Sequence, residues 1–157
     1  MKTMDHLQSI RKFLKDSGST FTEIHHEATY TSEASALARG EALKTGGKAI
    51  IMKAGEEFKL FVIAADRKVD SNKIKTICNV RKLRFATAEE LDQQTGLVAG
   101  SIPPFGRPIL DLELFIDVSI TQNEKIAFNA GSLTDSVVMS VSDYLRVAQG
   151  RVENFSA

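Results

Sequence analysis

Cysteine and histidine are scarce in this sequence of 157 residues, which contains one cysteine and three histidines. The single cysteine, Cys78, excludes an internal disulfide framework. Its spacing from Ile74 and Ile77 on an expected helix favours a small buried side chain, with a reactive thiol as the alternative. So few sulfur and imidazole ligands do not supply the spaced pairs of a structural zinc site. We therefore expect neither a metal nor a cofactor.

Long hydrophobic runs and a net charge are also missing. No apolar run approaches the ~18 residues that would span a membrane, and the segment Met1 to His6 lacks the apolar stretch of a secretory signal. We therefore expect a cytoplasmic protein with no membrane partner. The chain has 20 basic and 20 acidic residues, so as a whole it has no electrostatic preference for a nucleic acid, and no DNA partner is expected.

Charge is nevertheless unevenly distributed along the chain. Residues 67–84 contain seven basic residues and one acid, whereas 111–124 contain four acids and no base. The basic segment is either a surface that contacts a few phosphates or the solvated face of a helix and its flanks, and the sequence leaves both interpretations open. The acidic segment is interpreted as a solvated face, because the paired carboxylates of a glycosidase cannot be identified in it.

Hydrophobic periodicity and capping residues predict helices that interrupt the strands early in the chain, with shorter connections later. The expected helices run from Asp5 to Ser17, from Ser32 to Gly46, from Asp70 or Ser71 to about Asn79, from Thr87 toward Gln94, and from Ser140 through Val147. The expected strands cover residues 21–26, 49–52, 58–64, 83–86, 109–116, 125–129 and 137–141. This order predicts an α+β fold with a mixed sheet flanked by helices, and 157 residues suffice for one domain with its own core.

All three prolines, Pro103, Pro104 and Pro108, stand within six residues of the segment 95–108. Proline has no N–H and restricts the residue before it, while the glycines on either side admit conformations closed to other residues. The segment is therefore expected to be a rigid loop, pinned to the core by its interleaved apolar residues. Such a loop fixes the backbone groups of Gly100 and its neighbours, and fixed backbone dipoles suit a site without catalytic side chains.

Lys48 stands directly before an apolar run and directly after Gly46 and Gly47. The three residues do not form a nucleotide-binding P-loop, because Ala42 stands where that pattern needs glycine and Ala49 where it needs serine or threonine. An unpaired ammonium at the mouth of an apolar strand calls for an anionic partner. The simpler alternative is a lysine that reaches solvent.

Other catalytic arrangements have weaker support in the sequence. Ser101 and Ser132 each follow a glycine, but the glycine spacing of a serine-hydrolase elbow is absent. His25 and His26 are adjacent, so on a strand they point to opposite faces and cannot easily bind one metal. One of the two is expected to face the core, and a place near a substrate is the alternative.

Three segments together resemble one family. They are residues 31–51, which begin Thr-Ser-Glu-Ala, residues 95–106, which contain Gly-Ser-Ile-Pro-Pro, and residues 128–145, which begin Phe-Asn-Ala-Gly. In this order they are similar to the YbaK and prolyl-tRNA-synthetase-associated editing-domain family, whose members remove amino acids from mischarged tRNA. The resemblance implies a single editing domain over residues 1–157, with a mixed, curved sheet.

The resemblance also assigns roles to residues. The family's essential lysine falls on Lys48, which would hold the 3′-terminal adenosine or its phosphate, and its Gly-x-x-x-Pro motif falls on Gly100 to Pro104. The backbone of Gly100, Ser101 and Ile102, shaped by Pro104, would orient the ester carbonyl or the attacking water, assisted by a substrate hydroxyl or thiol. Three further residues are expected to line the substrate pocket: His26, Gly131 and Ser132.

The resemblance therefore implies hydrolysis of the ester bond of an aminoacyl-tRNA that carries a small amino acid. Ser101 replaces a glycine common in the motif and Pro103 stands where serine or valine is common, so no particular member's amino-acid preference transfers. We expect a free-standing enzyme that acts on the tRNA acceptor end, with tRNA identity supplied by that end, by the basic segment 67–84 or by a synthetase partner. The alternative function is a non-catalytic module that binds an aminoacyl or adenosyl group or regulates a synthetase.

Overall fold

The computed structural model describes residues 5–157, and the four residues Met1–Met4, which bear on the expectation about a secretory signal, lie outside them. The helices of the described chain are α1 (His6–Asp16), α2 (Ser32–Arg39), η1 (Leu43–Thr45, a 3₁₀ turn), α3 (Ser71–Cys78), α4 (Ala88–Thr95), α5 (Val118–Thr121) and α6 (Val141–Ala148). The strands are β1 (Phe21–His25), β2 (Gly47–Ala54), β3 (Glu57–Ala64), β4 (Leu83–Phe85), β5 (Glu113–Asp117), β6 (Lys125–Asn129), β7 (Asp135–Ser140) and β8 (Arg151–Glu153). No helix in residues 5–157 has the length and hydrophobicity needed to cross a membrane.

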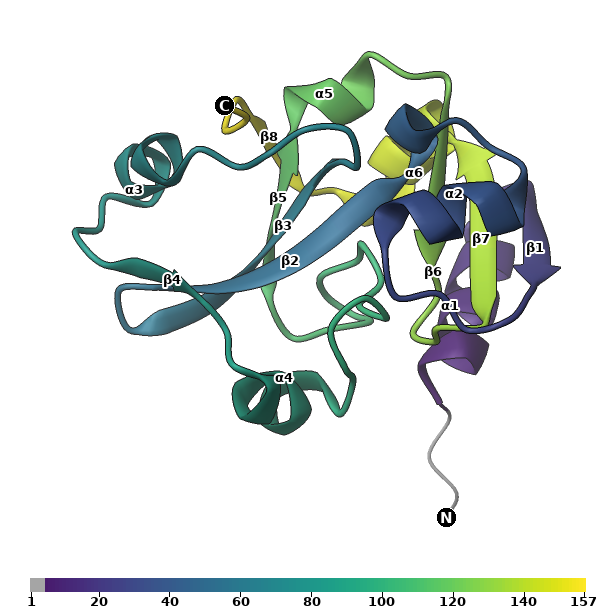
Figure 1. Ribbon diagram of the computed structural model, residues 1–157, viewed down its shortest axis with the longest axis horizontal. Coiled ribbons are helices and arrows are strands. Elements are labelled where there is room, and N and C mark those ends of the chain that lie inside the picture. Colours follow the sequence, from purple (N-terminus) through teal and green to yellow (C-terminus); the bar gives the residue numbers. More distant parts are fainter. Residues whose placement is uncertain (1–4) are drawn as a thin grey trace.

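The strands form two sheets. One is three-stranded and antiparallel, in the order β1-β7-β6, and the other is five-stranded, in the order β4-β2-β3-β5-β8. The larger sheet is mixed, because β4, β2 and β3 pair antiparallel whereas β3, β5 and β8 pair parallel. Figure 1 shows the long β2–β3 hairpin extending from α3 and β4 at the left toward the smaller sheet, with α1 and α2, at the right. The predicted α+β class with a mixed sheet is confirmed, with its strands divided between two sheets.

The two sheets meet where β2 begins. Gly46 forms a parallel bridge with Ala127 of β6, and a Cβ atom added to Gly47 would lie 2.5 Å from Cδ1 of Ile126. Because Ile126 is fully buried, a side chain at position 47 would push the sheets apart. Glycine permits this close approach, and the approach places Lys48, the next residue, at the junction of the sheets.

The glycine-proline loop packs into the main core. Phe105 of this loop makes edge-on aromatic contacts with Phe13, Phe128 and Tyr144, at ring-centroid distances of 5.8, 5.3 and 5.5 Å. Such contacts contribute about 0.5–1.5 kcal/mol each beyond the area they bury. Ile102 is buried as well, whereas Val98 is 59% exposed. The apolar residues after Gly100 therefore anchor the loop, as the sequence predicts.

Helix α2 differs from its prediction. Its N-cap is Thr31, whose side chain accepts the Ala34 N–H, and the helix ends at Gly40, whose φ of 71° is left-handed. Its buried residues are Ser35 and Ala36, whereas Leu37, the largest apolar residue of the helix, is 85% exposed. The reason is that α2 borders the pocket that Ser32, Ser35 and Arg39 line, so the pocket side of the helix is the one that is turned inward.

The segment around β5 also differs. Residues 107–109 form a turn and 110–112 a bend, because the N–H groups of Ile109 and Leu110 both donate to the carbonyl of Gly106, at 2.9 and 3.0 Å. Asp117, expected on a solvated face, is fully buried, and its carboxylate accepts the N–H groups of Ser119 at 3.0 Å and Phe155 at 2.7 Å. This acid begins α5 and holds the C-terminal segment. Neither α5 nor β8 was predicted, since each is too short to show a period.

Candidate active site

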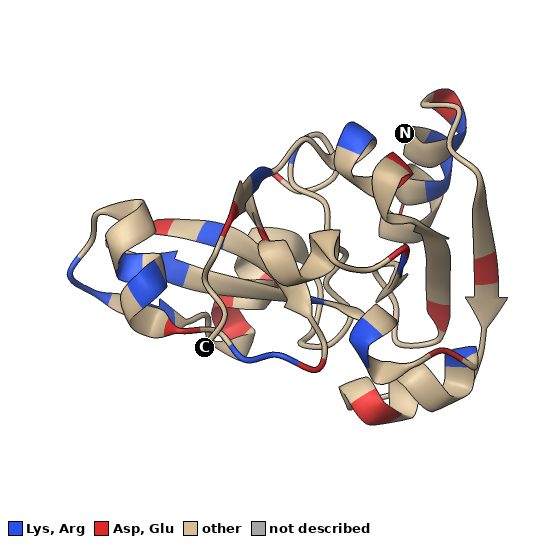
Figure 2. Ribbon diagram, turned by 90° about the horizontal axis from the view of Figure 1, so that it is seen from above, with Lys and Arg blue, Asp and Glu red and all other residues tan. Residues whose placement is uncertain are grey.

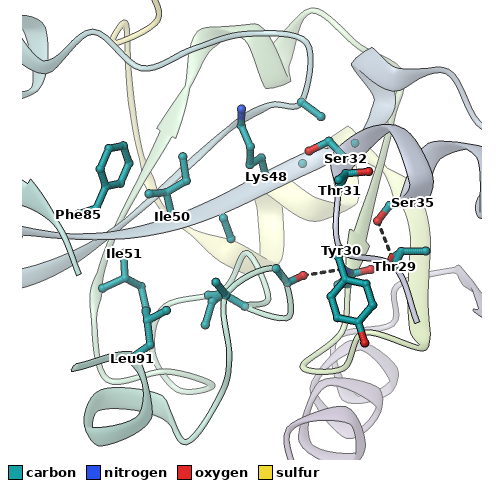
Figure 3. A pocket seen from close by; sticks show the side chains of 18 of the residues that line it. Thr29, Tyr30, Thr31, Ser32, Ser35, Lys48, Ile50, Ile51, Phe85 and Leu91 are labelled. Carbon is teal, nitrogen blue, oxygen red and sulfur yellow. Dashed lines mark hydrogen bonds between the residues drawn. The ribbon is translucent and has the colours of Figure 1, made fainter. Parts of the chain in front are cut away.

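A pocket of about 400 Å³ opens between α2, the exposed edge of β2 and the glycine-proline loop, and Figure 3 shows it from close by. Lys48, Gly100 and Ile102 all line this pocket. The structure therefore brings the lysine and the glycine of the Gly-x-x-x-Pro segment to one cavity, although they lie far apart in the sequence.

Lys48 supplies the positive charge on the β2 side of the pocket. In Figure 3 its side chain extends from one face of β2, whereas Ile51 lies on the other face, toward Leu91. The ammonium donates a hydrogen bond to the carbonyl of Arg67 at 3.0 Å, which leaves two of its three donors for a ligand. Burial is the main cause that lowers the pKa of Lys48, and Lys68 lowers it further, while Glu33 and Asp66 act to raise it.

The loop wall is held by side chains from other elements. Gly100 has a left-handed φ of 87°, and its carbonyl accepts a hydrogen bond from Nδ2 of Asn129 in β6 at 2.5 Å. Four residues further on, the carbonyl of Pro104 accepts the hydroxyl of Tyr144 in α6 at 2.7 Å, and this tyrosine is fully buried. Both ends of the Gly-x-x-x-Pro segment are thus fixed from outside the loop.

Arg39 and Asn129 line the same pocket, and the sequence did not single out either as a site residue. The Arg39 guanidinium donates to Oγ of Ser136 at 2.9 Å and to Oδ1 of Asn129 at 3.0 Å. Burial lowers the pKa of Arg39 to about 10, with Glu41 acting to raise it, so the group remains a cation at neutral pH. Arg39 therefore holds the asparagine that holds Gly100. No local pattern indicates such a network, because its members come from three separate elements.

The edge of β2 also offers backbone groups to the pocket. β2 pairs with β4 only from Met52 onward, and the carbonyl of Ile51 accepts the N–H of Ala86 across that edge. Backbone groups on an antiparallel strand alternate between its two sides, so Ala49 directs its N–H and carbonyl to the same side as Ile51. Ala49 lines the pocket, and no strand of the described chain, residues 5–157, pairs with this part of the edge. A substrate can therefore pair with it.

Five predicted site residues do not line this pocket. Ser101 is buried and donates its hydroxyl to the carbonyl of Val98, and Pro104 is buried within the loop. Nε2 of His26 lies 2.8 Å from Oγ of Ser136, so His26 contacts the Arg39 network through that serine.

The other two lie in the β6–β7 turn. A Cβ on Gly131 would lie 2.6 Å from the Cβ of His6, so this glycine allows α1 to pack closely. The hydroxyl of Ser132 donates to Asp135 at 2.8 Å. Both residues therefore shape a turn, and neither lines the pocket as the sequence predicted.

Two exposed aromatic rings flank the pocket. Tyr30 is 78% exposed and Phe85 is 60% exposed, and Figure 3 places them on opposite sides of Lys48. Both line the pocket, whose lining includes no histidine and no carboxylate. Within residues 5–157, no three side chains of the metal-binding types gather into a cluster. The site is therefore a set of hydroxyls, two cations, backbone groups and apolar surface.

The solved structures include a protein of closely similar fold, described as a candidate trans-editing enzyme for prolyl tRNA synthetase. It aligns with a TM-score of 0.83 over 99% of both chains, at 19% identity. At that identity the likeness concerns the fold alone, and it agrees with the α+β domain predicted from the sequence.

Sequence comparisons give the family. The chain is 35% identical over 154 residues to the multifunctional Ser/Thr-tRNA deacylase ProXp-y of Escherichia coli (strain K12), covering 94% of this chain and 91% of that protein. It is 23% identical over 159 residues to the prolyl-tRNA editing protein ProX of Acetoanaerobium sticklandii, covering 98% and 97%. Residues 26–147 match the family model described as the aminoacyl-tRNA editing domain. The chain therefore belongs to the aminoacyl-tRNA editing domain family, and the family resemblance and hydrolase class expected from its sequence are confirmed.

Proposed function

We propose that this protein hydrolyses the ester bond of a mischarged aminoacyl-tRNA that carries a small amino acid. The observation that carries the proposal is the shared pocket, which is lined both by a rigid glycine turn and by a lysine that forms no ion pair within residues 5–157. The names of the two relatives, a Ser/Thr-tRNA deacylase and a prolyl-tRNA editing protein, describe the same class of reaction.

Lys48 would bind the 3′-terminal nucleotide through its phosphate. A phosphate oxygen accepts hydrogen bonds from a cation, and the Lys48 ammonium has two donors left after its hydrogen bond to the Arg67 carbonyl. The ester carbonyl would then lie toward Gly100 and Ala49. Their backbone N–H groups are the proposed donors to the oxyanion that forms when water attacks.

The reaction requires no nucleophilic side chain. Water adds to the carbonyl carbon, and the tetrahedral intermediate expels the ribose oxygen, which leaves with a proton as the free tRNA hydroxyl. Because the lining has neither a histidine nor a carboxylate, the proton from the attacking water would pass to a hydroxyl or thiol group of the substrate, or to solvent. Positioned donors are sufficient for an activated ester, since one oxyanion donor contributes about 2.7–4 kcal/mol to transition-state stabilisation.

The polar end of the pocket supports a small amino acid. Thr29 and Ser35 are both buried, and their hydroxyls share a hydrogen bond of 2.7 Å. Each hydroxyl has both donor and acceptor capacity, so a substrate side chain with a hydroxyl can join the pair. A site that hydrogen-bonds such a group discriminates more strongly than an apolar pocket does.

The test is a deacylation assay on a panel of aminoacyl-tRNAs with the wild-type protein and the Lys48→Ala variant. We expect hydrolysis of at least one small amino acid, and a loss of at least about 100-fold in kcat/KM in the variant, with a Tm within about 2 °C of wild type. Lys68→Ala, which removes a nearby exposed lysine outside the pocket, is the control and keeps full activity.

A non-catalytic module is the competing function. It would bind a non-hydrolysable aminoacyl-adenosine analogue and turn over no charged tRNA, and that result would refute the proposed hydrolysis. A cytoplasmic location, action as one editing domain over residues 1–157 and association with a synthetase are further parts of the proposal. Co-purification with a synthetase would test the last of them.

A further inference from the structure

A second cavity of about 390 Å³ lies on the other side of β4, between the β2–β3 turn and the end of α3. We call it the basic groove. Its lining contains five basic side chains and one acid: Lys53, Lys75, Arg81, Lys82, Arg84 and Glu56. Figure 2 shows several blue segments at the left end of the molecule, where α3 lies. The seven basic residues noted between positions 67 and 84 therefore contribute four members to one concave surface.

Most of these charges have no internal partner. Within residues 5–157, Lys53, Lys75, Arg81 and Lys82 form no ion pair, whereas Arg84 makes a two-point contact with Glu90 at 2.7 and 2.9 Å. Like charges that face one groove repel one another and gain nothing for the fold. Their arrangement is favourable when a polyanion lies between them.

The basic groove and the active-site pocket share β4. Arg84 lines the groove, and the next residue, Phe85, lines the pocket and is 60% exposed. The two residues pair with Lys53 and Met52 of β2, so the strand that carries Lys48 continues along both cavities. A ligand that enters the pocket past Phe85 therefore passes from the basic groove toward Lys48.

We propose that the basic groove binds phosphates of the tRNA acceptor stem and that Phe85 stacks on a base of the single-stranded 3′ end. This inference rests on the proposed function and adds the surface that holds the rest of the substrate. Cationic side chains bind RNA phosphates without reading sequence, and an exposed aromatic ring stacks on an unpaired base. The groove, Phe85 and the pocket follow one another along β4, as the duplex stem, the single-stranded end and the aminoacyl group follow one another along a tRNA.

The experiment compares two substrates, an aminoacyl-tRNA and the matching aminoacyl-adenosine 5′-phosphate, which keeps the phosphate proposed for Lys48 and lacks all the others. The variant is Lys75→Ala, Arg81→Ala and Lys82→Ala combined. We expect its KM for the aminoacyl-tRNA to rise at least about tenfold at low salt. The slope of log(kcat/KM) against log salt should become shallower by about 2–3, because each lost phosphate contact reduces the magnitude of this slope by about 1. Hydrolysis of the aminoacyl-adenosine 5′-phosphate and the kcat for the aminoacyl-tRNA should not change.

A matched control removes the same number of charges elsewhere. Lys12→Ala, Lys15→Ala and Arg107→Ala combined takes away three exposed basic side chains outside both cavities, and it should leave KM and the salt slope at wild-type values. Phe85→Leu keeps an apolar side chain but removes the ring, and it should lower kcat/KM for the aminoacyl-tRNA by about tenfold.

The outcomes separate the two proposals. If the wild type hydrolyses aminoacyl-tRNA while the groove variant keeps its KM and salt slope, the groove does not hold the stem, and an acidic protein becomes its better partner. If the wild type hydrolyses neither substrate, the proposed function fails instead. Equal losses on both substrates would also overturn the inference, because the groove would then act on the reaction centre.

Discussion

The two walls of the active-site pocket are built in different ways. The β2 wall is held by its backbone ladder with β3, and its functional group is the end of a long side chain that other residues hardly restrain. The loop wall has no ladder, and its shape depends on Asn129 and Tyr144, which reach it from β6 and α6. One wall therefore presents a movable charge, and the other presents backbone groups in fixed positions.

Because of this difference, a substitution on the β2 wall should reduce activity alone, whereas one on the loop wall should reduce both activity and stability. Removing the Lys48 ammonium takes away one hydrogen bond to a carbonyl at the surface, so the fold loses little. Removing a support of the loop wall leaves a polar backbone group without its partner and displaces the groups that would contact the substrate. Substitutions on the two walls should therefore differ in the ratio of lost activity to lost stability.

Among the changes that test the loop wall and the pH response, the largest effect is expected when Asn129 is replaced by alanine. The Gly100 carbonyl would lose its hydrogen bond and Arg39 would lose an acceptor, so kcat should fall about 100-fold, while KM changes less. Asn123→Ala is the matched control, because Asn123 also donates from Nδ2 to a backbone carbonyl, that of Lys44, at an exposed site. Steady-state kinetics of both variants measure the effect, and equal activities would show that Gly100 needs no support.

An intermediate effect is expected for Tyr144→Phe. The change removes only the hydroxyl, which leaves the carbonyl of Pro104 without its donor in a fully buried site. An unsatisfied buried group costs about 1–3 kcal/mol, which corresponds to a Tm lower by about 2–12 °C in a chain of this size. Tyr30→Phe makes the same change at an exposed ring and should leave Tm unchanged. Thermal unfolding of the two variants measures the difference in Tm. A wild-type Tm for Tyr144→Phe would show that the loop wall does not depend on the tyrosine hydroxyl.

The smallest effect is expected from pH, and it concerns the β2 wall. Burial lowers the pKa of Lys48, so its ammonium loses a proton at a lower pH than an exposed lysine does. Affinity for a non-hydrolysable aminoacyl-adenosine 5′-phosphate analogue should therefore be retained at neutral pH and weaken as the pH rises toward the lysine range. Lys48→Arg keeps its charge throughout that range and should bind with no such decline. Calorimetric titration at several pH values tests this prediction. If the affinity of both proteins declined as the pH rose, a group other than Lys48 would be responsible for the decline.

Local signals in the sequence were sufficient for most elements. The capping box from Thr87 to Glu90 begins α4 as predicted, and Ser140 caps α6 as predicted. The errors lie where tertiary contacts override a local pattern. Ile109 and Leu110 are apolar enough for a strand, but their N–H groups both donate to the Gly106 carbonyl. Leu37 is exposed on a helix whose buried residues are Ser35 and Ala36.

The site was predictable in part, and for a physical reason. A lysine beside two glycines and a glycine-proline loop are recognisable because their residue types have unusual backbone properties. Arg39, Asn129 and the open edge at Ala49 have no such mark. Their place in the site depends on which elements lie beside one another, and His26, Gly131 and Ser132 lie outside the pocket for the same reason.

The sequence by itself determined the alternation of helices and strands, the rigid loop and the family, since these follow from short-range periodicity, from proline and glycine stereochemistry and from similarity to relatives. Only the tertiary structure decided that Lys48 and Gly100 share one cavity, that Asn129 and Tyr144 hold the loop, and that scattered basic residues form a groove beside Phe85. Those relations join residues distant in sequence, and they arise when Gly47 lets the two sheets approach closely.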